Sequence, residues 1–295
     1  MSFDLSQWSG RRLDTVEAAL SRWVVAEAPA GLGDAMRYAV LDGGKRLRPL
    51  LVLAASEAVQ GNQDAALRAA CAVELIHAYS LVHDDMPCMD NDVLRRGKPT
   101  VHVKFGEAQA LLAGDALQAL AFELLAPEGQ DIAFSIQATL CRLLARAAGH
   151  EGMAGGQAID LASVGHALTE EQLRHMHRLK TGALLQGSVM MGAACGQAST
   201  ASQEALARYG AAVGLAFQVV DDILDVTADS ATLGKTAGKD AAQDKPTYVS
   251  LMGLERSRAL AGQLLDQALA ALDASGLADT HALAALARMV VHRQN

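Results

Sequence analysis

The chain has 295 residues, of which 51% are hydrophobic and only 4% aromatic, and it carries a net charge of −8. This length supplies a core for one large domain or two modest ones. The balance of 25 basic against 33 acidic residues argues against a general nucleic-acid-binding protein, which would show a basic stripe. Alanine and leucine dominate, β-branched runs are short and prolines are few, so we expect an all-α fold.

The cysteines and the first residues of the chain indicate a reducing compartment. No CxxC pair occurs and no charged-then-apolar leader opens the chain, so we expect a cytoplasmic protein without a disulfide framework. No uninterrupted apolar span is expected to reach membrane length. The nearest candidate, residues 65–82, contains Arg68, Glu74 and His77 and is interpreted as a buried helix. Stable membrane insertion is therefore not expected.

Helical periodicity starts near the beginning of the chain, where apolar residues recur at spacings of three and four between Leu13 and Val24. Glycines at 31–33 and 43–44 interrupt it, and Pro49 fits the first turn of a new helix. Expected helices after the first cover residues 35–41, 50–59, 65–83, 108–125, 131–149, 170–195, 203–226, 247–272 and 281–291. No internal repeat or Pro/Ser-rich linker divides the chain, so we expect a single domain over residues 1–295.

Two segments depart from ordinary helical composition. Residues 182–196 contain repeated glycines, each of which costs roughly 1 kcal/mol relative to alanine inside a helix. We therefore expect close helix contacts or a cavity wall there. Residues 228–245 are polar and contain glycine together with Lys235, Lys239 and Lys245, and we interpret them as a mobile loop over a site.

Two aspartate clusters adjoin apolar sequence that predicts buried helices. The first contains Asp84, Asp85 and Asp90, and the second contains Asp221, Asp222 and Asp225. Crowded carboxylates that lose hydration repel one another. Oxygen-only clusters suit Mg²⁺, which binds a few carboxylates together with substrate phosphates. The clusters therefore predict a metal-bridged site for a polyanionic substrate.

The two clusters are expected to differ in geometry. Asp221 and Asp225 are four residues apart and share one helical face, close to that of Gln218. Asp84 and Asp90 are six residues apart and would lie on different sides of a straight helix. Because Pro87 disfavours helical geometry at the preceding residue, we expect the helix to end there and the loop to bring Asp90 back beside Asp84.

Basic residues accompany the acidic clusters. They form two sets, Lys45 with Arg46 and Arg48, and Arg95 with Arg96 and Lys98, while Lys180, Lys235 and Lys245 stand alone. Arginine binds phosphate oxygens in bidentate fashion and lysine acts as a mobile point charge, so the carboxylates, metal and cations together predict a diphosphate site. Arg46 and Lys98 are interpreted as solvated side chains.

His77 lies seven residues before Asp84, on roughly the same helical face. Its ring could donate a hydrogen bond to a second phosphate group. The alternative is that His77 is an ordinary core histidine.

The run from His83 to Thr100 resembles the first aspartate-rich motif of the trans-isoprenyl diphosphate synthases, and Phe217 to Asp225 resembles the second. Segments 43–49, 180–182 and 233–240 also match that family's pattern. The resemblance spans nearly the whole chain. It implies a bundle of long, mostly antiparallel helices around a deep central cavity, which is usually a homodimer.

The resemblance also implies roles for individual residues. Isopentenyl diphosphate would be held by Lys45, Arg48, His77 and Arg96. The allylic diphosphate would be held by Arg95, Lys180 and Lys235, with Lys245 assisting. Three Mg²⁺ ions, which Mn²⁺ could replace, would be bound by Asp84, Asp90 and Asp221, helped by Asp85 and Asp225. The allylic cation would be faced by Thr181, Gln218 and the Lys180 carbonyl.

The implied reaction is a head-to-tail condensation. The allylic carbon–oxygen bond breaks, Mg²⁺ and the cations stabilise the leaving diphosphate, and the double bond of isopentenyl diphosphate attacks the allylic cation. Tyr79 and Ser80, one turn before Asp84, would meet the growing tail. Tyr79 and the two-residue insertion in the first motif resemble the bacterial farnesyl diphosphate synthases, which implies a farnesyl product; products of ten or twenty carbons stay open.

Three rival functions are considered. A class I terpene cyclase also ionises a diphosphate, but it pairs its aspartate cluster with an Asn/Ser/Glu motif and needs no second diphosphate pocket. A non-catalytic regulatory subunit would be expected to lose aspartates or arginines from one motif. A metal-dependent phosphohydrolase using His83 and Asp84 would need an upstream ligand histidine, and His77 is the first histidine in the chain.

Overall fold

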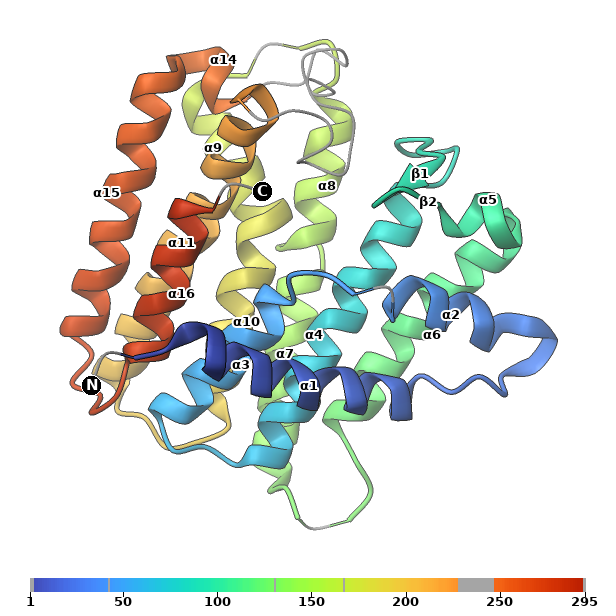
Figure 1. Ribbon diagram of the computed structural model, residues 1–295, viewed down its shortest axis with the longest axis horizontal. Helices are drawn as coiled ribbons and strands as arrows, with labels where there is room; N and C mark the ends of the chain where they lie inside the picture. Colours follow the sequence, from blue (N-terminus) through green and yellow to red (C-terminus); the bar gives the residue numbers. More distant parts are fainter. Residues whose placement is uncertain (1–2, 42, 130, 167, 228–246, 294–295) are drawn as a thin grey trace.

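The computed structural model describes residues 3–41, 43–129, 131–166, 168–227 and 247–293. Within these ranges the fold is helical except for one pair of two-residue antiparallel strands (Figure 1). The expected all-α class is confirmed.

The first half of the chain, up to the loop after the first aspartate cluster, forms four α-helices. These are α1 (Leu5–Trp23), α2 (Leu32–Val40), α3 (Leu47–Ala58) and α4 (Gln63–Asp84), with a short 3₁₀ turn η1 (Pro29–Gly31). The strands β1 (Leu94–Arg95) and β2 (Lys98–Pro99) follow, and then α5 (Val101–Phe105), α6 (Glu107–Leu125) and α7 (Phe134–Ala148).

The second half of the described chain is also made of helices. It contains α8 (Met153–Ala162), α9 (Glu170–His177), a π-helix η2 (Arg178–Gly182), α10 (Ala183–Ala194) and α11 (Thr200–Thr227). After the undescribed stretch come α14 (Tyr248–Met252), α15 (Leu254–Asp273) and α16 (His281–His292).

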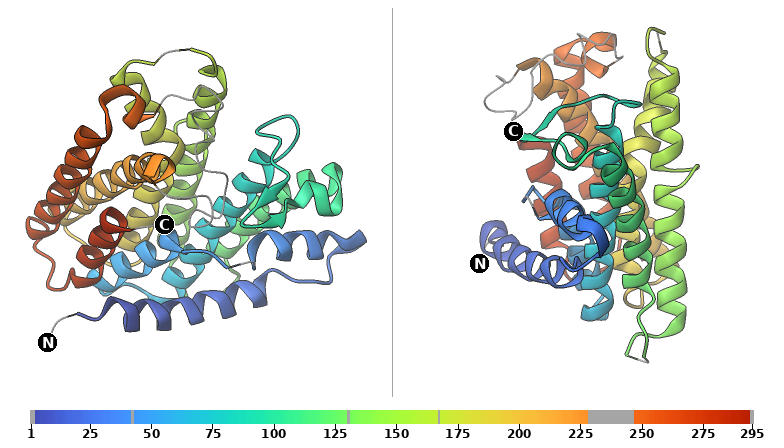
Figure 2. Two further views of the ribbon diagram at one scale, coloured as in Figure 1. Left: turned by 45° about the horizontal axis from the view of Figure 1, so that its top comes forward. Right: turned by 90° about the vertical axis from the view of Figure 1, so that its right-hand side faces the viewer.

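The long helices run along one direction, and α1 lies across them (Figures 1 and 2). Helix α4 packs against α6, α11 packs against α15, and α10 contacts α3, α7 and α11. Helix α10 contributes to both apolar cores, with Leu184 and Met191 in one and Leu185 and Val189 in the other. Helices α4 and α11, which carry the two aspartate clusters, end toward the same end of the bundle (Figure 1).

The glycines of segment 182–196 permit close helix contact, as the sequence predicted. A side chain at Gly192 would overlap the carbonyl oxygen of Val52 on α3. The Cβ of a residue at position 214 on α11 would lie 2.9 Å from the Cα of Gly182. Larger residues would force these helices apart, so the glycines let α10 approach α3 and let α11 approach η2.

Several expected helix boundaries are wrong. The expected helix over residues 170–195 is divided into α9, the π-helix and α10, and the expected helix over 247–272 is broken at Gly253, which has φ +82°. Helix α8 was not expected at all. A single-sequence pattern detects the 3.6-residue period, but it does not detect an inserted residue that converts one turn into a π-helix.

Two described helices, α4 and α6, are long and apolar enough to cross a membrane by length and composition alone. Neither helix is an uninterrupted apolar span, because α4 contains Arg68 and Glu74 and α6 contains Asp115. In α4, 67% of the most apolar 18-residue window is buried, which confirms its interpretation as a core helix; in α6 the share is 39%. Leu111 and Leu112 account for part of the exposed apolar surface of α6.

Candidate active site

The first aspartate cluster forms a loop that folds back on the end of α4. The backbone N–H of Asp90 donates to the carbonyl oxygen of Asp84 at 2.8 Å, and that of Asp92 donates to Asp85 at 3.1 Å. Helix α4 ends at Asp84, three residues before Pro87. The prediction that the loop returns Asp90 to Asp84 is confirmed.

The carboxyl group of Asp84 lies in an environment that disfavours its charge. Burial raises the pKa of Asp84 to about 6; the nearby Lys180 and Arg95 lower it, while Asp90 and Asp85 raise it further. A cation placed between Asp84 and Asp90 would relieve both the lost hydration and the repulsion. This is the electrostatic setting that a divalent ion would stabilise.

Asp85 forms an ion pair with a basic residue of the strand pair. It is only 2% exposed, and both its oxygens accept hydrogen bonds from Arg95 on β1, at 2.6 to 3.1 Å. Burial opposes the charge on Arg95, but its hydrogen bonds to Asp85 outweigh this effect and raise its pKa. Asp85 therefore orients Arg95, and its part in metal binding stays a prediction.

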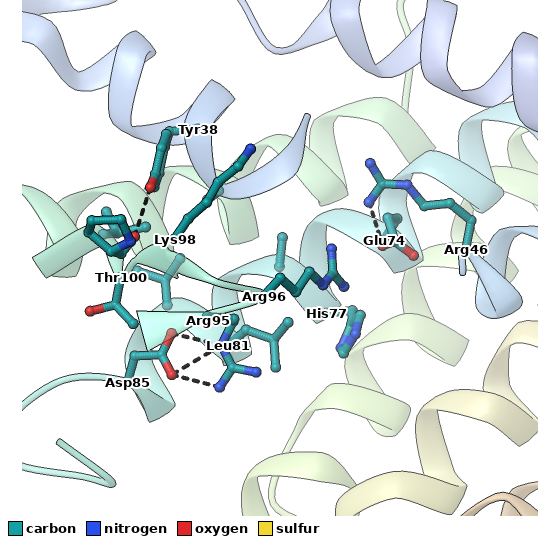
Figure 3. Close-up of a pocket in the computed structure, with 15 residues that line it drawn as sticks. Tyr38, Arg46, Glu74, His77, Leu81, Asp85, Arg95, Arg96, Lys98 and Thr100 are labelled. Atoms are coloured by element: carbon teal, nitrogen blue, oxygen red, sulfur yellow. Dashed lines mark hydrogen bonds and ion pairs between the residues drawn. The ribbon is translucent and has the colours of Figure 1, made fainter. Parts of the chain in front are cut away.

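Arg96 connects the strand pair to the glycine turn before α3. Its Nη1 donates to the carbonyl oxygen of Gly43 at 2.6 Å. A Cβ at Gly44, where φ is +136°, would lie 2.9 Å from the Arg96 guanidinium. Two sets of cations that lie about fifty residues apart in the sequence are thus joined. In Figure 3, Arg96 and His77 lie between Arg95 at one side of a pocket and Arg46 at the other.

The surroundings of His77 favour the neutral form of its ring. Burial lowers the pKa of His77 well below its usual value of 6.5, and the charges of Arg48, Arg96, Arg95 and Arg46 lower it further. A neutral imidazole still donates one N–H, so His77 keeps the capacity to bind a phosphate oxygen.

Arg48 and Arg46 differ sharply in their surroundings. The Nε atom of Arg48 is buried and has no hydrogen-bond partner among the described residues. Arg46, which was interpreted as a solvated side chain, is only 5% exposed and is ion-paired with Glu17 and Glu74. That interpretation is wrong, because the αL backbone of Arg46 turns its side chain into the protein.

The π-helix brings together the residues expected to face the allylic substrate. Thr181 Oγ1 donates to Gln218 Oε1 on α11 at 2.9 Å. Lys180 Nζ lies 2.5 Å from the carboxylate of Asp160 on α8, a residue that sequence reasoning missed. A side chain at Gly156, one turn before Asp160, would overlap the backbone nitrogen of Lys180. The paired glycines at 155–156 were the available sequence signal for this contact.

The adjacent aspartates of the second cluster, Asp221 and Asp222, have different surroundings. Asp222 is 2% exposed; it accepts a hydrogen bond from Gln218 and one from the backbone N–H of Tyr248, both at 2.8 Å. It therefore fixes α11 to the start of α14. Asp221 is only partly buried, and Arg293 donates to its Oδ1 at 3.2 Å. Arg293, near the end of the chain, was not anticipated, because no local pattern marks it.

Comparison of the chain with known protein families identifies one that matches most of its sequence. The family model described as polyprenyl synthetase matches residues 29–285. The chain belongs to the polyprenyl synthetase family. It is therefore a trans-prenyl diphosphate synthase, a prenyltransferase of a family that binds isopentenyl and allylic diphosphates.

Three relatives illustrate the range of polyprenyl synthetases that this chain resembles. A "Heterodimeric geranylgeranyl pyrophosphate synthase large subunit 1, chloroplastic" from Arabidopsis thaliana is 47% identical, over 100% of this chain and 81% of its own length. A "Probable farnesyl diphosphate synthase" from Sinorhizobium fredii is 52% identical, over 88% and 80%. A solved FPP/GFPP synthase from Zymomonas mobilis superposes with a TM-score of 0.86 at 42% identity, covering 97% and 98%.

The carboxylates of this polyprenyl synthetase fit Mg²⁺ that arrives with substrate. Among the described residues, no three His, Cys, Asp or Glu side chains gather closely enough to hold a metal by themselves. Magnesium is commonly bound through one or two carboxylates and completed by substrate phosphates, which suits Asp84 with Asp90 on one side and Asp221 on the other. The family is typically Mg²⁺-dependent. Asp225, which was also expected to help bind Mg²⁺, is only 4% exposed, and its part in metal binding stays a prediction.

The expected floor residues lie on α4 beneath the first motif. Tyr79 is half-buried; its ring meets that of His83 edge-on, with centroids 5.7 Å apart, and its hydroxyl faces the side chain of Gln118 on α6. Ser80 donates to the carbonyl oxygen of His77 at 2.8 Å and is bound to its own helix. Tyr79 is therefore the stronger candidate for contact with a prenyl tail. Lys235 and Lys245 lie outside the described residues.

Proposed function

We propose that this enzyme condenses isopentenyl diphosphate with dimethylallyl diphosphate and then with geranyl diphosphate, and that it releases (2E,6E)-farnesyl diphosphate. The observation that carries the proposal is the position of Tyr79 on α4, five residues before Asp84. At 1.5 Å per residue, its Cα lies roughly 7–8 Å along the helix axis from that of Asp84. A large side chain at this depth would limit how far a tail can extend from the ionisation site.

Each part of the described site has a step in this reaction. Lys45, Arg48 and His77 hold the diphosphate of isopentenyl diphosphate. Arg95, oriented by Asp85, and Lys180, oriented by Asp160, hold the allylic diphosphate. Asp84, Asp90 and Asp221 would hold Mg²⁺, which would supply positive charge to offset the charge that develops on the leaving diphosphate.

The π-helix acts on the other side of the breaking bond. Its carbonyl groups and the Thr181–Gln218 pair present oxygen atoms to the allylic cation, because these dipoles stabilise positive charge without a strong nucleophile. The double bond of isopentenyl diphosphate then forms the new carbon–carbon bond. The proton lost from the adjacent carbon passes to the released diphosphate, so no side-chain base is needed.

A geranylgeranyl product is the second candidate. It is favoured by curated relatives with that name, including the 47% identical protein from Arabidopsis thaliana, whereas the 52% identical protein from Sinorhizobium fredii is named for the farnesyl product. Overall similarity therefore does not separate the two products. We rest the choice of the farnesyl product on Tyr79, whose ring is expected to limit the depth available to the prenyl tail.

Product analysis tests the proposal. The purified enzyme is incubated with Mg²⁺, labelled isopentenyl diphosphate and, separately, dimethylallyl, geranyl or farnesyl diphosphate. We expect a fifteen-carbon product from the first two starters and little turnover of the third. A dominant twenty-carbon product would select the geranylgeranyl alternative. Hydrocarbon formed from farnesyl diphosphate alone would indicate a cyclase.

We also propose a homodimer and a single domain over residues 1–295. The dimer is supported by the exposed apolar surface of α6, where the neighbouring residues Leu111 and Leu112 are 47% and 53% exposed. Soluble monomers rarely expose adjoining large apolar side chains. Light scattering at several concentrations tests this. Leu112→Asp is expected to yield monomers, and Val25→Asp, on another exposed surface, serves as the control.

A further inference from the structure

In the sequence, Arg46 lies between Lys45 and Arg48, two cations of the proposed isopentenyl diphosphate site. Its side chain is more deeply buried than theirs. Lys45 is exposed and Arg48 is partly buried, whereas Arg46 is only 5% exposed. A guanidinium that is withdrawn from water in this way needs partners to compensate for the lost hydration. Arg46 has three such partners.

The guanidinium of Arg46 joins three helices. Its Nη1 donates to Glu74 on α4 at 2.7 Å, its Nε donates to Glu17 on α1 at 2.7 Å, and its Nη2 donates to the carbonyl oxygen of Val40, the last residue of α2, at 2.6 Å. Burial opposes the charge on Arg46, but these carboxylates outweigh the effect and raise its pKa. The side chain therefore ties the turn before α3 to the helices around it.

The backbone of this turn needs such an anchor. Gly43 and Gly44 have φ values of +72° and +136°, and Arg46 itself has φ +46° and ψ +34°. The left-handed region is disfavoured for residues with a Cβ, so surrounding contacts must hold Arg46 in it. Arg46 is also the residue that caps the start of α3, with no side-chain capping bond.

Glu74 links this anchor to the rest of the site. It is 4% exposed and lies three residues before His77 on α4, so both side chains occupy nearly the same helical face. Its charge also acts on two other arginines, because it partly offsets the burial that lowers the pKa of Arg48 and of Arg96. Figure 3 shows the Arg46–Glu74 pair beside His77.

From this geometry we propose that Arg46 is a positioning residue for the isopentenyl diphosphate site. It holds the left-handed turn that carries Lys45 and leads into Arg48 at the start of α3, and it acts through these residues without touching substrate. This inference rests on the proposed function, which assigns that site to isopentenyl diphosphate. A small displacement of the turn would weaken this site and leave the allylic site on β1 and η2 unchanged.

The test compares Arg46→Met with Arg12→Met. Arg12 forms an ion pair of the same 2.7 Å length between α1 and Glu57 of α3, far more exposed than that of Arg46, so it is a matched control outside the site. For Arg46→Met we expect KM for isopentenyl diphosphate to rise by about tenfold or more, whereas KM for geranyl diphosphate changes by less than about twofold. Arg46→Lys should recover part of the loss, and Arg12→Met should behave as the wild type.

A purely structural role predicts a different pattern. It would lower the active fraction, and with it the apparent kcat, and would leave both KM values unchanged. Equal changes in the two KM values, or no change in a folded variant, would overturn the proposal.

If Arg46→Met does not fold, the double variant with Glu74→Met removes the uncompensated buried carboxylate, since apolar replacement of a buried ion pair is commonly tolerated. The same KM pattern is expected. Binding of isopentenyl diphosphate to the metal-free protein, measured by calorimetry, gives a readout without turnover. A wild type that binds but does not turn over would contradict the proposed function alone, whereas equal affinities of wild type and variant would contradict the role of Arg46.

Discussion

Lys180 on the π-helix and Asp160 on α8 form an ion pair of 2.5 Å, although neither helix boundary is visible in the sequence. Asp160 is 9% exposed in its side chain and Lys180 is 27% exposed, so the carboxylate is nearly buried while the ammonium group keeps more contact with solvent. The pair gives Lys180 one direction in which to extend. A flexible four-carbon side chain is thereby prepared for an anionic group before that group binds.

Replacement of Asp160 tests this preparation. Asp160→Asn keeps the shape but removes the charge that orients Lys180, and we expect kcat/KM for the allylic diphosphate to fall by roughly ten- to a hundredfold. KM for isopentenyl diphosphate should change much less. Steady-state kinetics with each substrate varied in turn gives both values. Glu170→Gln, at an exposed ion pair on α9, is the control, and equal effects in the two variants would contradict the assigned role.

The close approach of α8 to the π-helix predicts an unusual response to a small substitution. Gly156→Ala would push a methyl group into the Lys180 backbone, so we expect a loss of stability of about 1–3 kcal/mol and a lower kcat. Gly262→Ala on α15 has open space around it and should stabilise the protein by roughly 0.5–1 kcal/mol. Urea unfolding measures both. A neutral Gly156→Ala variant with full activity would mean that α8 can move away freely.

The raised pKa of Asp84 predicts how stability depends on pH in metal-free protein. The folded chain keeps this proton up to about pH 6, whereas an ordinary carboxyl loses it near 3.8. Between these values the folded state binds more protons than the unfolded state, so this group destabilises the fold as pH rises from about 4 to about 6. Its contribution at neutral pH is at most about 3 kcal/mol.

Asp84→Asn should therefore be more stable than the wild type at pH 7 without divalent cations, and the difference should shrink as pH falls toward 4. Urea unfolding with and without Mg²⁺ and inorganic diphosphate is the measurement. The added ions should stabilise the wild type and leave the variant nearly unchanged. Asp115→Asn, on the exposed side of α6, should show neither effect. If the wild type instead gained stability relative to Asp84→Asn as pH rose from about 4 to 7, the raised pKa of Asp84 would be refuted.

Tyr79 should set the length of the product through its ring, with Gln118 holding its hydroxyl. Tyr79→Ala is expected to shift the main product from fifteen to twenty or more carbons. Tyr79→Phe and Gln118→Ala should broaden the distribution only slightly, because the ring remains in place. Chromatography of dephosphorylated products measures the shift. An unchanged distribution in Tyr79→Ala would remove Tyr79 as the floor and place the limit elsewhere in the cavity.

Local chemistry in the sequence predicted several structural features of the candidate site. The aspartate spacing of the second cluster predicted a shared helical face for Asp221 and Asp225, and Pro87 predicted the end of α4 and the return of Asp90 to Asp84. Apolar composition predicted the all-α class. These features depend on interactions over a few residues, and short-range backbone geometry determines them without reference to the rest of the fold.

The choice of partners was decided only by the tertiary structure. Asp85 and Asp222 look like their neighbours in the sequence, but burial and the approach of Arg95 and Tyr248 give them structural tasks. Arg46 resembles the cations beside it, yet two carboxylates from α1 and α4 withdraw it from the site. Whether a charged side chain faces substrate or the core depends on the desolvation and counter-charges that packing provides. These come from residues that are distant in the sequence, so the local sequence around a charged residue does not reveal them.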